Sequence, residues 1–212
     1  MATDAAVAKQ GTPRTFTPSE MPVKAVDPDC GAPPVFVVQG ALERRLKEQL
    51  AWVLLDGGSN GGNNEGGHEG VTLRILTRSS IEGLFSDEQR KRHVDYRQNM
   101  GMTEYAEAPL GAAFLLTLIS PDVESTAHYF RGHPTSSIAY AVNYGLHVVG
   151  RRELRGAYAD DLRCLGGHYH DRDTRESVAA AVRDAAAAFH RWCAVEDPAA
   201  RGPWAKAGIS GC

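Results

Sequence analysis

Hydrophobic and polar positions between residues 39 and 77 follow two different periods. Over 39–50 the apolar residues recur on one helix face and charged residues cover the rest, which predicts an amphipathic helix. The apolar run 52–56 predicts a short buried strand. Residues 71–77 alternate between apolar and polar side chains, as expected of a strand with one buried face.

A second helix and a third strand are expected before Pro121. Ser86 and Gln89 have the spacing of a capping box, so a helix should begin there and extend to Met102. The apolar stretch 112–119 predicts the third strand. With the first two strands paired antiparallel, the order helix, strand, strand, helix, strand predicts a small α+β core over 37–125.

The C-terminal part has a mostly helical pattern. Apolar stripes occupy 154–165 and 178–192, and Asp173 with Glu176 is the expected cap of the last helix. Residues 138–148 fit either a strand or a helix, because their apolar residues alternate while the intervening alanines suit a helix. We therefore expect a helical extension over 126–197 and an irregular tail over 198–212.

Composition and charge narrow the class of protein. Residues 1–34 are rich in proline, which predicts a flexible arm. A net charge of −3 gives no general attraction to nucleic acid, and the longest apolar run, 108–119, is too short to span a bilayer. The 4 cysteines are far apart, so buried or free thiols in a reducing compartment are expected rather than a disulfide framework or a structural zinc site. Without a clear targeting signal, a mitochondrial or cytoplasmic location is expected.

Two segments invite a binding interpretation. The loop 57–70 is rich in glycine, but it leads into a strand and lacks the lysine of a phosphate-binding loop, so a flexible hairpin loop is favoured. The run Arg90-Lys-Arg-His93 is a basic helix turn that reads as a solvated or docking surface. Contact with nucleic acid is expected only through this local patch.

Histidines and one cysteine supply the candidate metal ligands. His68 precedes the strand at 71–77, and His93 lies on the half-apolar side of its helix. The simpler interpretation is an exposed loop residue and a histidine at the edge of the core. The functional one is that neutral imidazoles from both ligate a metal or cluster. Cys164, His168 and His170 gather ligand types in one turn, although their spacing matches no standard zinc site and a polar turn is the simpler interpretation. Motifs of nucleophilic or zinc-dependent hydrolysis are missing, so an enzyme is not expected.

The stretch from residue 42 to about 124 resembles the BolA-like family. Leu54-Leu-Asp-Gly-Gly-Ser59 is similar to the end of that family's first strand, and Ile81-Glu-Gly83 to a turn that follows its second. Arg92-His93 with Tyr96 is similar to its Arg-His helix, although without a short insertion Arg90 takes the histidine's place. Residues 113–121 are similar to its closing strand.

The resemblance implies a KH-like α+β fold and a non-enzymatic adaptor. Such a protein would be the partner of a monothiol glutaredoxin in iron–sulfur cluster trafficking or its regulation. His93 and His68 would be its ligands to a shared [2Fe–2S] cluster. The alternatives are a structural or assembly subunit of a large complex, contacting neighbouring subunits, and a metalloenzyme built on Cys164, His168 and His170.

Overall fold

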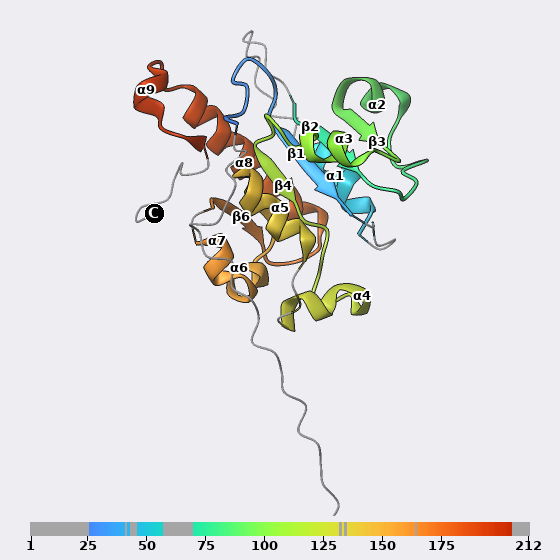
Figure 1. The fold of residues 1–212 in the computed structure, drawn as a ribbon. Helices are drawn as coiled ribbons and strands as arrows, with labels where there is room; N and C mark the ends of the chain where they lie inside the picture. The colour runs from blue at the N-terminus through green and yellow to red at the C-terminus, as the bar shows by residue number, and fades with distance from the viewer. Residues whose placement is uncertain are drawn as a thin grey trace, which may run out of the picture.

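The computed structural model describes residues 26–40, 42, 46–56, 70–131, 133, 135–163 and 165–204. Their core is a 6-stranded sheet in which every paired strand runs parallel, in the order β3-β2-β1-β4-β5-β6 (Figure 1). The strands are β1 Val35–Gln39, β2 Thr72–Leu76, β3 Val94–Arg97, β4 Phe114–Leu116, β5 His147–Arg151 and β6 Gly167–His170.

Helices follow the strands in alternation. They are α1 Glu48–Asp56, α2 Asp87–His93, α3 Met102–Glu107, α4 Glu124–Ala127, α5 Ser136–Tyr144, α6 Glu153–Ala157, α7 Ala159–Leu162, α8 Arg175–Cys193 and α9 Pro198–Arg201, with a 3-10 turn at His128–Arg131. Within the described residues, none of the helices has the length and apolar character needed to cross a bilayer.

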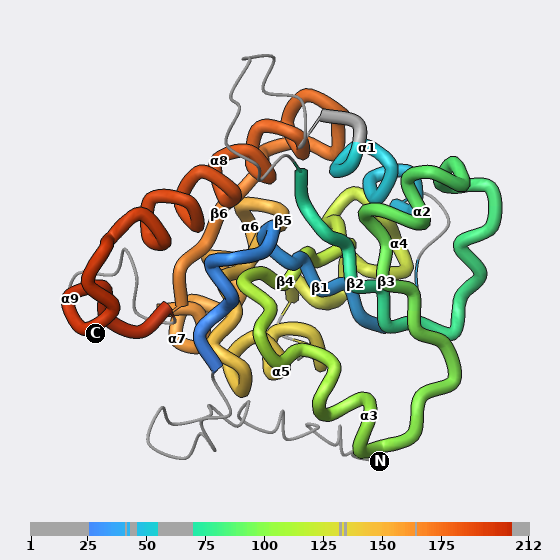
Figure 2. Tube along the Cα trace, turned by 90° about the horizontal axis from the view of Figure 1, so that it is seen from above, coloured from blue at the N-terminus to red at the C-terminus, as the bar shows by residue number. Residues whose placement is uncertain are grey.

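Helices cover both faces of the sheet. Figure 2 shows α1 and α8 on one side and α3 and α5 on the other. The first face buries Phe36, Leu73 and Phe114 against α1 and α8, and the second buries Val37, Leu115 and Val148 against α5, α6 and α7. Because both faces are covered, the central strands are apolar throughout rather than alternating.

The first described strand, β1, lies in the middle of the sheet, and the later strands are added outward in both directions. β1 pairs with β2 on one side and with β4 on the other. Phe36 and Phe114 stack across that central pair, with ring centroids 4.6 Å apart. This doubly wound order places a topological switch point between β1 and β4, and such sheets bind ligands outside the carboxyl ends of their strands near that point.

Several sequence predictions are confirmed. Residues 72–76 form a strand, and 114–116 form another within the expected 112–119. The capping box of Ser86 and Gln89 is present with both of its hydrogen bonds. The stripe of α8 is buried as expected, although Thr174, not Asp173, caps this helix. The ambiguous segment 138–148 contains both structures, the end of α5 and the beginning of β5.

The expected α+β core needs correction. The helix expected over 39–50 begins only at Glu48, because Gln39 ends β1 and Gly40 has a positive φ. Residues 52–56 are helical and belong to α1, so they do not pair with β2, whose partners β1 and β3 are both parallel to it. The helix expected to reach Met102 ends at His93, where β3 begins. The coarser expectation of mixed helices and strands holds, while a KH-like order of helix, strand, strand, helix and strand is not confirmed.

The C-terminal half is also less helical than expected. β5 and β6 continue the sheet beyond the boundary expected near residue 125. The tail expected to be irregular contains α9 and the buried Trp204. At the other end, residues 1–25 of the expected arm lie outside the described residues, whereas Cys30 forms a disulfide with Cys193 and corrects the expectation of free thiols for this pair.

Candidate functional site

The first component of the candidate site is the glycine that ends β1. Gly40 has φ +95°, a conformation that side chains with a Cβ rarely adopt. Its N–H donates to the carbonyl of Leu76 at the end of β2 (3.1 Å). Among the described residues, no atom lies within 4 Å of the position that a Cβ on Gly40 would take. The backbone therefore faces open space at the carboxyl end of the central strand.

The second component is the turn that follows β2. The hydroxyl of Thr77 accepts from the N–H of Ser79 (3.0 Å). The hydroxyl of Ser79 accepts from the N–H of Leu42, in the segment that follows β1 (3.2 Å). Side chains of this kind hold a turn by replacing backbone partners. They join the turn after β2 to the turn after β1.

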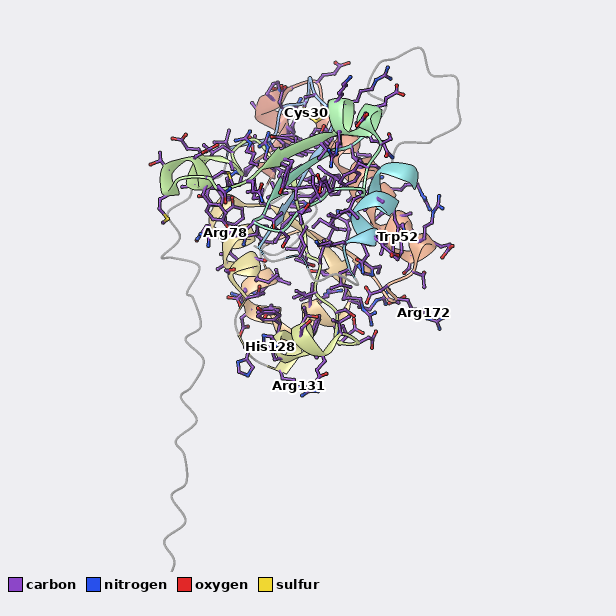
Figure 3. All side chains as sticks on the ribbon, turned by 90° about the vertical axis from the view of Figure 1, so that its right-hand side faces the viewer. Cys30, Trp52, Arg78, His128, Arg131 and Arg172 are labelled. Carbon is purple, nitrogen blue, oxygen red and sulfur yellow. A yellow bond between two sulfur atoms is a disulfide. The ribbon has the colours of Figure 1, made fainter. Side chains whose placement is uncertain are left out.

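Arg78 lies at the centre of this braced turn. Its carbonyl accepts from the side-chain amide of Gln98 (3.1 Å), and the carbonyl of Ser79 accepts from the hydroxyl of Tyr96 (3.0 Å). The side chain of Arg78 is exposed at the surface (Figure 3), and no hydrogen bond or ion pair of its guanidinium is found among the described residues. The backbone at Arg78 is thus held in place, while its guanidinium has no partner among the described residues.

A cavity of about 510 Å³ opens between these components. It lies at the carboxyl ends of β1, β2 and β3, and its walls combine two guanidiniums with apolar side chains. The lining residues are Gly40, Leu76, Thr77, Arg78, Ser79, Arg97, Asn99, Met100, Met102 and Tyr105. No carboxylate is among them, so the cavity favours an anionic ligand.

A half-buried ion-pair network fixes the second guanidinium. Asp95 binds Arg97 (2.9 Å) and Arg74 (2.8 Å). Burial alone would raise the pKa of Asp95, but the hydrogen bonds from Arg97 and Arg74 outweigh it and hold the pKa below its ordinary value. Asp95 therefore stays ionised and neutralises one of its two arginine partners. The group of Asp95, Arg97 and Arg74 keeps a net positive charge.

Tyr105 forms an apolar wall of the cavity. Its hydroxyl donates to the side-chain oxygen of Gln39, the last residue of β1. Burial raises the pKa of Tyr105, so this hydroxyl stays protonated and remains a donor. The hydroxyl of Tyr140 donates to the carbonyl of Tyr105 (3.2 Å), which ties α3 to α5. The aromatic ring is therefore held in a defined position.

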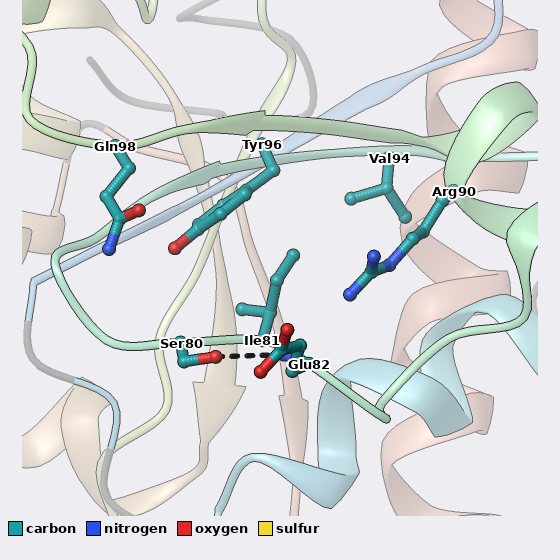
Figure 4. Close-up of a pocket in the computed structure, with 7 residues that line it drawn as sticks. All are labelled: Ser80, Ile81, Glu82, Arg90, Val94, Tyr96 and Gln98. Atoms are coloured by element: carbon teal, nitrogen blue, oxygen red, sulfur yellow. Dashed lines mark hydrogen bonds between the residues drawn. The ribbon is translucent and has the colours of Figure 1, made fainter.

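A second groove of about 440 Å³ lies on the other side of the same turn. Figure 4 shows Arg90 and Glu82 projecting into it from opposite walls, with Tyr96 directed toward Ser80. Because a cation and a carboxylate share this groove, it lacks the one-sided charge of the cavity beside Arg78. Elsewhere in the basic turn, Arg92 pairs with Glu88 (3.1 Å) on the exposed helix surface.

The carboxyl ends of β4, β5 and β6 are closed by an ion-pair cluster. Arg151 has a side chain only 6% exposed and binds Asp122, Glu153 and Asp173 at 2.8–3.1 Å. Its hydrogen bond holds the pKa of Glu153 below the ordinary value. Every side of this guanidinium already has a carboxylate partner. It therefore fastens three loops together and offers no free positive charge to an anionic ligand.

Of the two predicted ligands to an iron–sulfur cluster, the structure describes only His93. His93 is the last residue of α2 and is half-buried. Its ring lies 3.0 Å from the position that a Cβ on Gly70 would take. His68 lies outside the described residues, so the expected pairing of the two histidines stays a prediction.

The candidate zinc ligands are directed to separate partners. Nδ1 of His168 lies 2.7 Å from a carboxylate oxygen of Asp184, and Nδ1 of His170 lies 3.0 Å from the carbonyl of Arg172. Cys164 lies outside the described residues. In the part of the chain that the structure describes, no three His, Cys, Asp or Glu side chains form a group that could hold a metal ion.

Sequence reasoning missed both Gly40 and Arg78. The signal was present, because Val35-Phe-Val-Val-Gln-Gly40 is an apolar, β-branched run that ends in glycine. Arg78 and Ser79 are polar residues directly after a correctly predicted strand. Only the parallel pairing of β1 with β2 brings the two turns together.

Neither a scan against protein-family models nor a search of curated proteins found a match to this chain. Fold and site together define a doubly wound α/β protein with a cationic cavity at the carboxyl ends of its first three strands.

Proposed function

We propose that the protein binds an adenosine nucleotide with a phosphate on its ribose, the ligand chemistry that NADP carries, in the cavity beside Arg78. The observation that carries the proposal is the exposed Arg78 guanidinium on a turn braced by Thr77 and Ser79. In doubly wound folds the turn after the second strand is where the ribose is recognised, and an arginine there accommodates a 2′-phosphate.

The remaining walls suit a nucleoside. Leu76, Met100 and Tyr105 supply apolar and aromatic surface against which a base can pack, and Met102 is 87% exposed at the rim. The open space at Gly40 lets a ligand approach the backbone closely. A phosphate on the ribose would find Arg78 on one side and Arg97 on the other.

The residues do not fit the diphosphate half of a dinucleotide site. That half needs a glycine-rich turn leading directly into a helix, whose N-terminus holds the diphosphate. Here Gly40 is the only glycine between β1 and α1, and α1 begins at Glu48, an acidic residue in its first turn. The proposal is therefore confined to the phosphorylated nucleoside, and no reaction step is derived.

Calorimetric titration with adenosine 2′,5′-bisphosphate and with adenosine 5′-monophosphate tests the proposal. The bisphosphate should bind more tightly, because only it places a phosphate at Arg78. Arg78→Ala should weaken its binding roughly 10- to 100-fold, since a charge-assisted hydrogen bond contributes about 1.5–3 kcal/mol. Binding of the monophosphate should change little.

Arg90→Ala is the matched control. It removes the same charge from the groove on the other side of the turn and should leave both affinities unchanged. Equal affinity for the two nucleotides, or equal loss in the Arg78 and Arg90 variants, would contradict the proposal.

A second candidate function, the iron–sulfur adaptor implied by the BolA-like resemblance, is favoured by one contact. Gly70 lies against the ring of His93 and follows His68 by two positions in the sequence. Imidazoles at these positions would hold one side of a [2Fe–2S] cluster, with a monothiol glutaredoxin and glutathione supplying thiolates.

Anaerobic cluster reconstitution with a monothiol glutaredoxin and glutathione, followed by visible circular dichroism, tests this second candidate. A heterodimer spectrum that changes in His93→Ala and in His68→Ala, but not in His128→Ala, is expected. The candidate fails if no shared cluster forms while the protein stays folded.

A further inference from the structure

A disulfide joins the beginning of the described chain to its longest helix. Cys30 precedes β1 and Cys193 is the last residue of α8, with their Cα atoms 5.4 Å apart. Both cysteines are only half-buried, so each residue is partly exposed to solvent. The bond lies at the amino ends of the strands, away from the cavity beside Arg78, and Figure 3 shows Cys30 and Arg78 on different parts of the molecule.

One guanidinium makes a hydrogen bond to the Cys30 sulfur of this pair. Nη1 of Arg201 is 3.1 Å from Sγ of Cys30. Nη2 donates instead to the carbonyls of Cys193 (3.2 Å) and Val195 (2.9 Å). The guanidinium carbon also lies 4.8 Å from the ring centroid of Trp192. Arg201 is thus fixed from several directions and its charge is held against Cys30.

One hydrogen-bond donor of Arg201 is unsatisfied. Its Nε is buried and has no hydrogen-bond partner among the described residues. A disulfide sulfur is a weak acceptor, whereas a thiolate is an anion that accepts strongly from a guanidinium. Opening the disulfide with the negative charge on Cys30 would therefore improve the environment of both groups.

We propose that Cys30–Cys193 is a thiol–disulfide exchange site for small thiols and dithiols, in which Sγ of Cys193 is attacked and Cys30 leaves as a thiolate. A neighbouring cation lowers the pKa of a thiol, and the sulfur with the lower pKa is the better leaving group. With a dithiol reductant, the first thiolate forms a bond to Cys193 and displaces Cys30. The second thiolate then displaces Cys193 and leaves the reductant as a disulfide, so two electrons and two protons pass to the protein.

Exchange at this site loosens the contacts by which Trp204 holds the C-terminal segment to the sheet. Trp204 donates from its backbone N–H to Asp27 (2.9 Å) and from its ring to the carbonyl of Ala113 (2.9 Å). Its ring stacks on the buried His147, with centroids 4.1 Å apart. The disulfide holds the segment with Asp27 to α8, so its opening removes the covalent brace behind these contacts. Fluorescence of Trp192 and Trp204 should report the change.

The attacked sulfur can be identified directly. The air-oxidised full chain carrying Cys164→Ser and Cys212→Ser is treated briefly with glutathione, new thiols are alkylated, and peptides are analysed by mass spectrometry. We expect the glutathione adduct on Cys193 and the alkyl group on Cys30, with a preference of roughly tenfold or more. Arg201→Ala should abolish the preference, and Arg201→Lys should retain part of it.

Arg191→Ala is the matched control. Arg191 and Arg201 both line a cavity of about 450 Å³ beside Trp204, but among the described residues only Arg201 makes a hydrogen bond to a disulfide sulfur. It should leave the preference unchanged. An even distribution of adducts, an adduct on Cys30, or an air-oxidised protein with two free thiols would overturn the proposal.

Thiol pKa values supply a second readout that does not depend on the Arg201 variants folding. In Cys193→Ser, the alkylation rate of Cys30 should rise with pH at a lower midpoint than that of Cys193 in Cys30→Ser. Equal midpoints would equally refute the assignment of Cys30 as the leaving group.

Discussion

At the scale of single residues, burial decides which polar groups are constrained and which are free to act. His147 is 3% exposed and stacks on Trp204, and its Nε2 lies 3.0 Å from the carbonyl of Trp204. This contact requires the proton on Nε2, so the neutral ring keeps an unprotonated Nδ1. Arg78, in contrast, is exposed with a braced backbone. The first residue supports the fold and the second is available to a ligand.

The buried state of His147 predicts a dependence of stability on acid. Burial lowers its pKa from 6.5 to about 4, against the opposing effect of the Trp204 carbonyl. Between these values the unfolded chain binds a proton that the folded protein does not. The free energy of unfolding should therefore fall as pH drops through this window, by as much as about 3 kcal/mol.

His147→Leu removes the titrating group and should flatten this acid dependence in urea unfolding measured at pH 7 and pH 4.5. It also leaves the Trp204 carbonyl without its partner, so stability at pH 7 should be lower. His170, whose pKa burial also lowers, remains and keeps part of the slope. An unchanged slope in His147→Leu would show that His147 does not carry the effect.

At the scale of elements, sequence patterns predicted β2, β4 and α8, whereas they missed β1 and β3 and misassigned residues 52–56. The sequence predicted α8 from its apolar stripe and β2 from its alternation, because each element also has a polar face. β1 was missed, because a parallel strand covered on both faces has no alternation. Residues 52–56 were taken for a strand because a short apolar run fits a buried helix equally well.

The sequence pattern missed β3 for a different reason. His93, Tyr96 and Met100 share a helical spacing, yet α2 ends after His93 and the next residues pair with β2. Tertiary pairing outweighed the local pattern there. The candidate site was not predicted for the same reasons, because its cavity lies where β1, β2 and β3 end.

The turn after β2 yields a prediction for this element. Ser79→Ala removes the hydroxyl that accepts from Leu42 and so loosens the link between the two turns. We expect a loss of about 1 kcal/mol in stability, and binding of adenosine 2′,5′-bisphosphate about fivefold weaker, because Arg78 is less well held. Thermal unfolding and calorimetric titration measure the two effects.

Ser80→Ala is the comparison for that experiment. Its hydroxyl accepts from the N–H of Glu82 on the side of the second groove, so nucleotide affinity should not change. An equal loss of affinity in both variants would mean that Ser79 has no special role in holding Arg78.

At the scale of the whole molecule, the two halves of the sheet differ in what they leave open. The carboxyl ends of β4, β5 and β6 are closed by the Arg151 cluster, while those of β1, β2 and β3 surround the cavity. No sequence pattern could predict this contrast, because it depends on strand order. The alternative role as a subunit of a large complex stays a prediction, and Met102, at 87% exposure, is the most exposed large apolar side chain described.

The central position of β1 has a consequence for how the polypeptide is made. As the chain leaves the ribosome, β1 can pair with β2 early, but its other edge has no partner until residues 114–116 emerge. The bond between Cys30 and Cys193, 163 positions apart, must wait until Cys193 has emerged. Pairings over such separations form slowly and leave strand edges exposed meanwhile. A nascent chain that stalls in its middle would therefore carry an open, apolar strand edge for chaperones to cover.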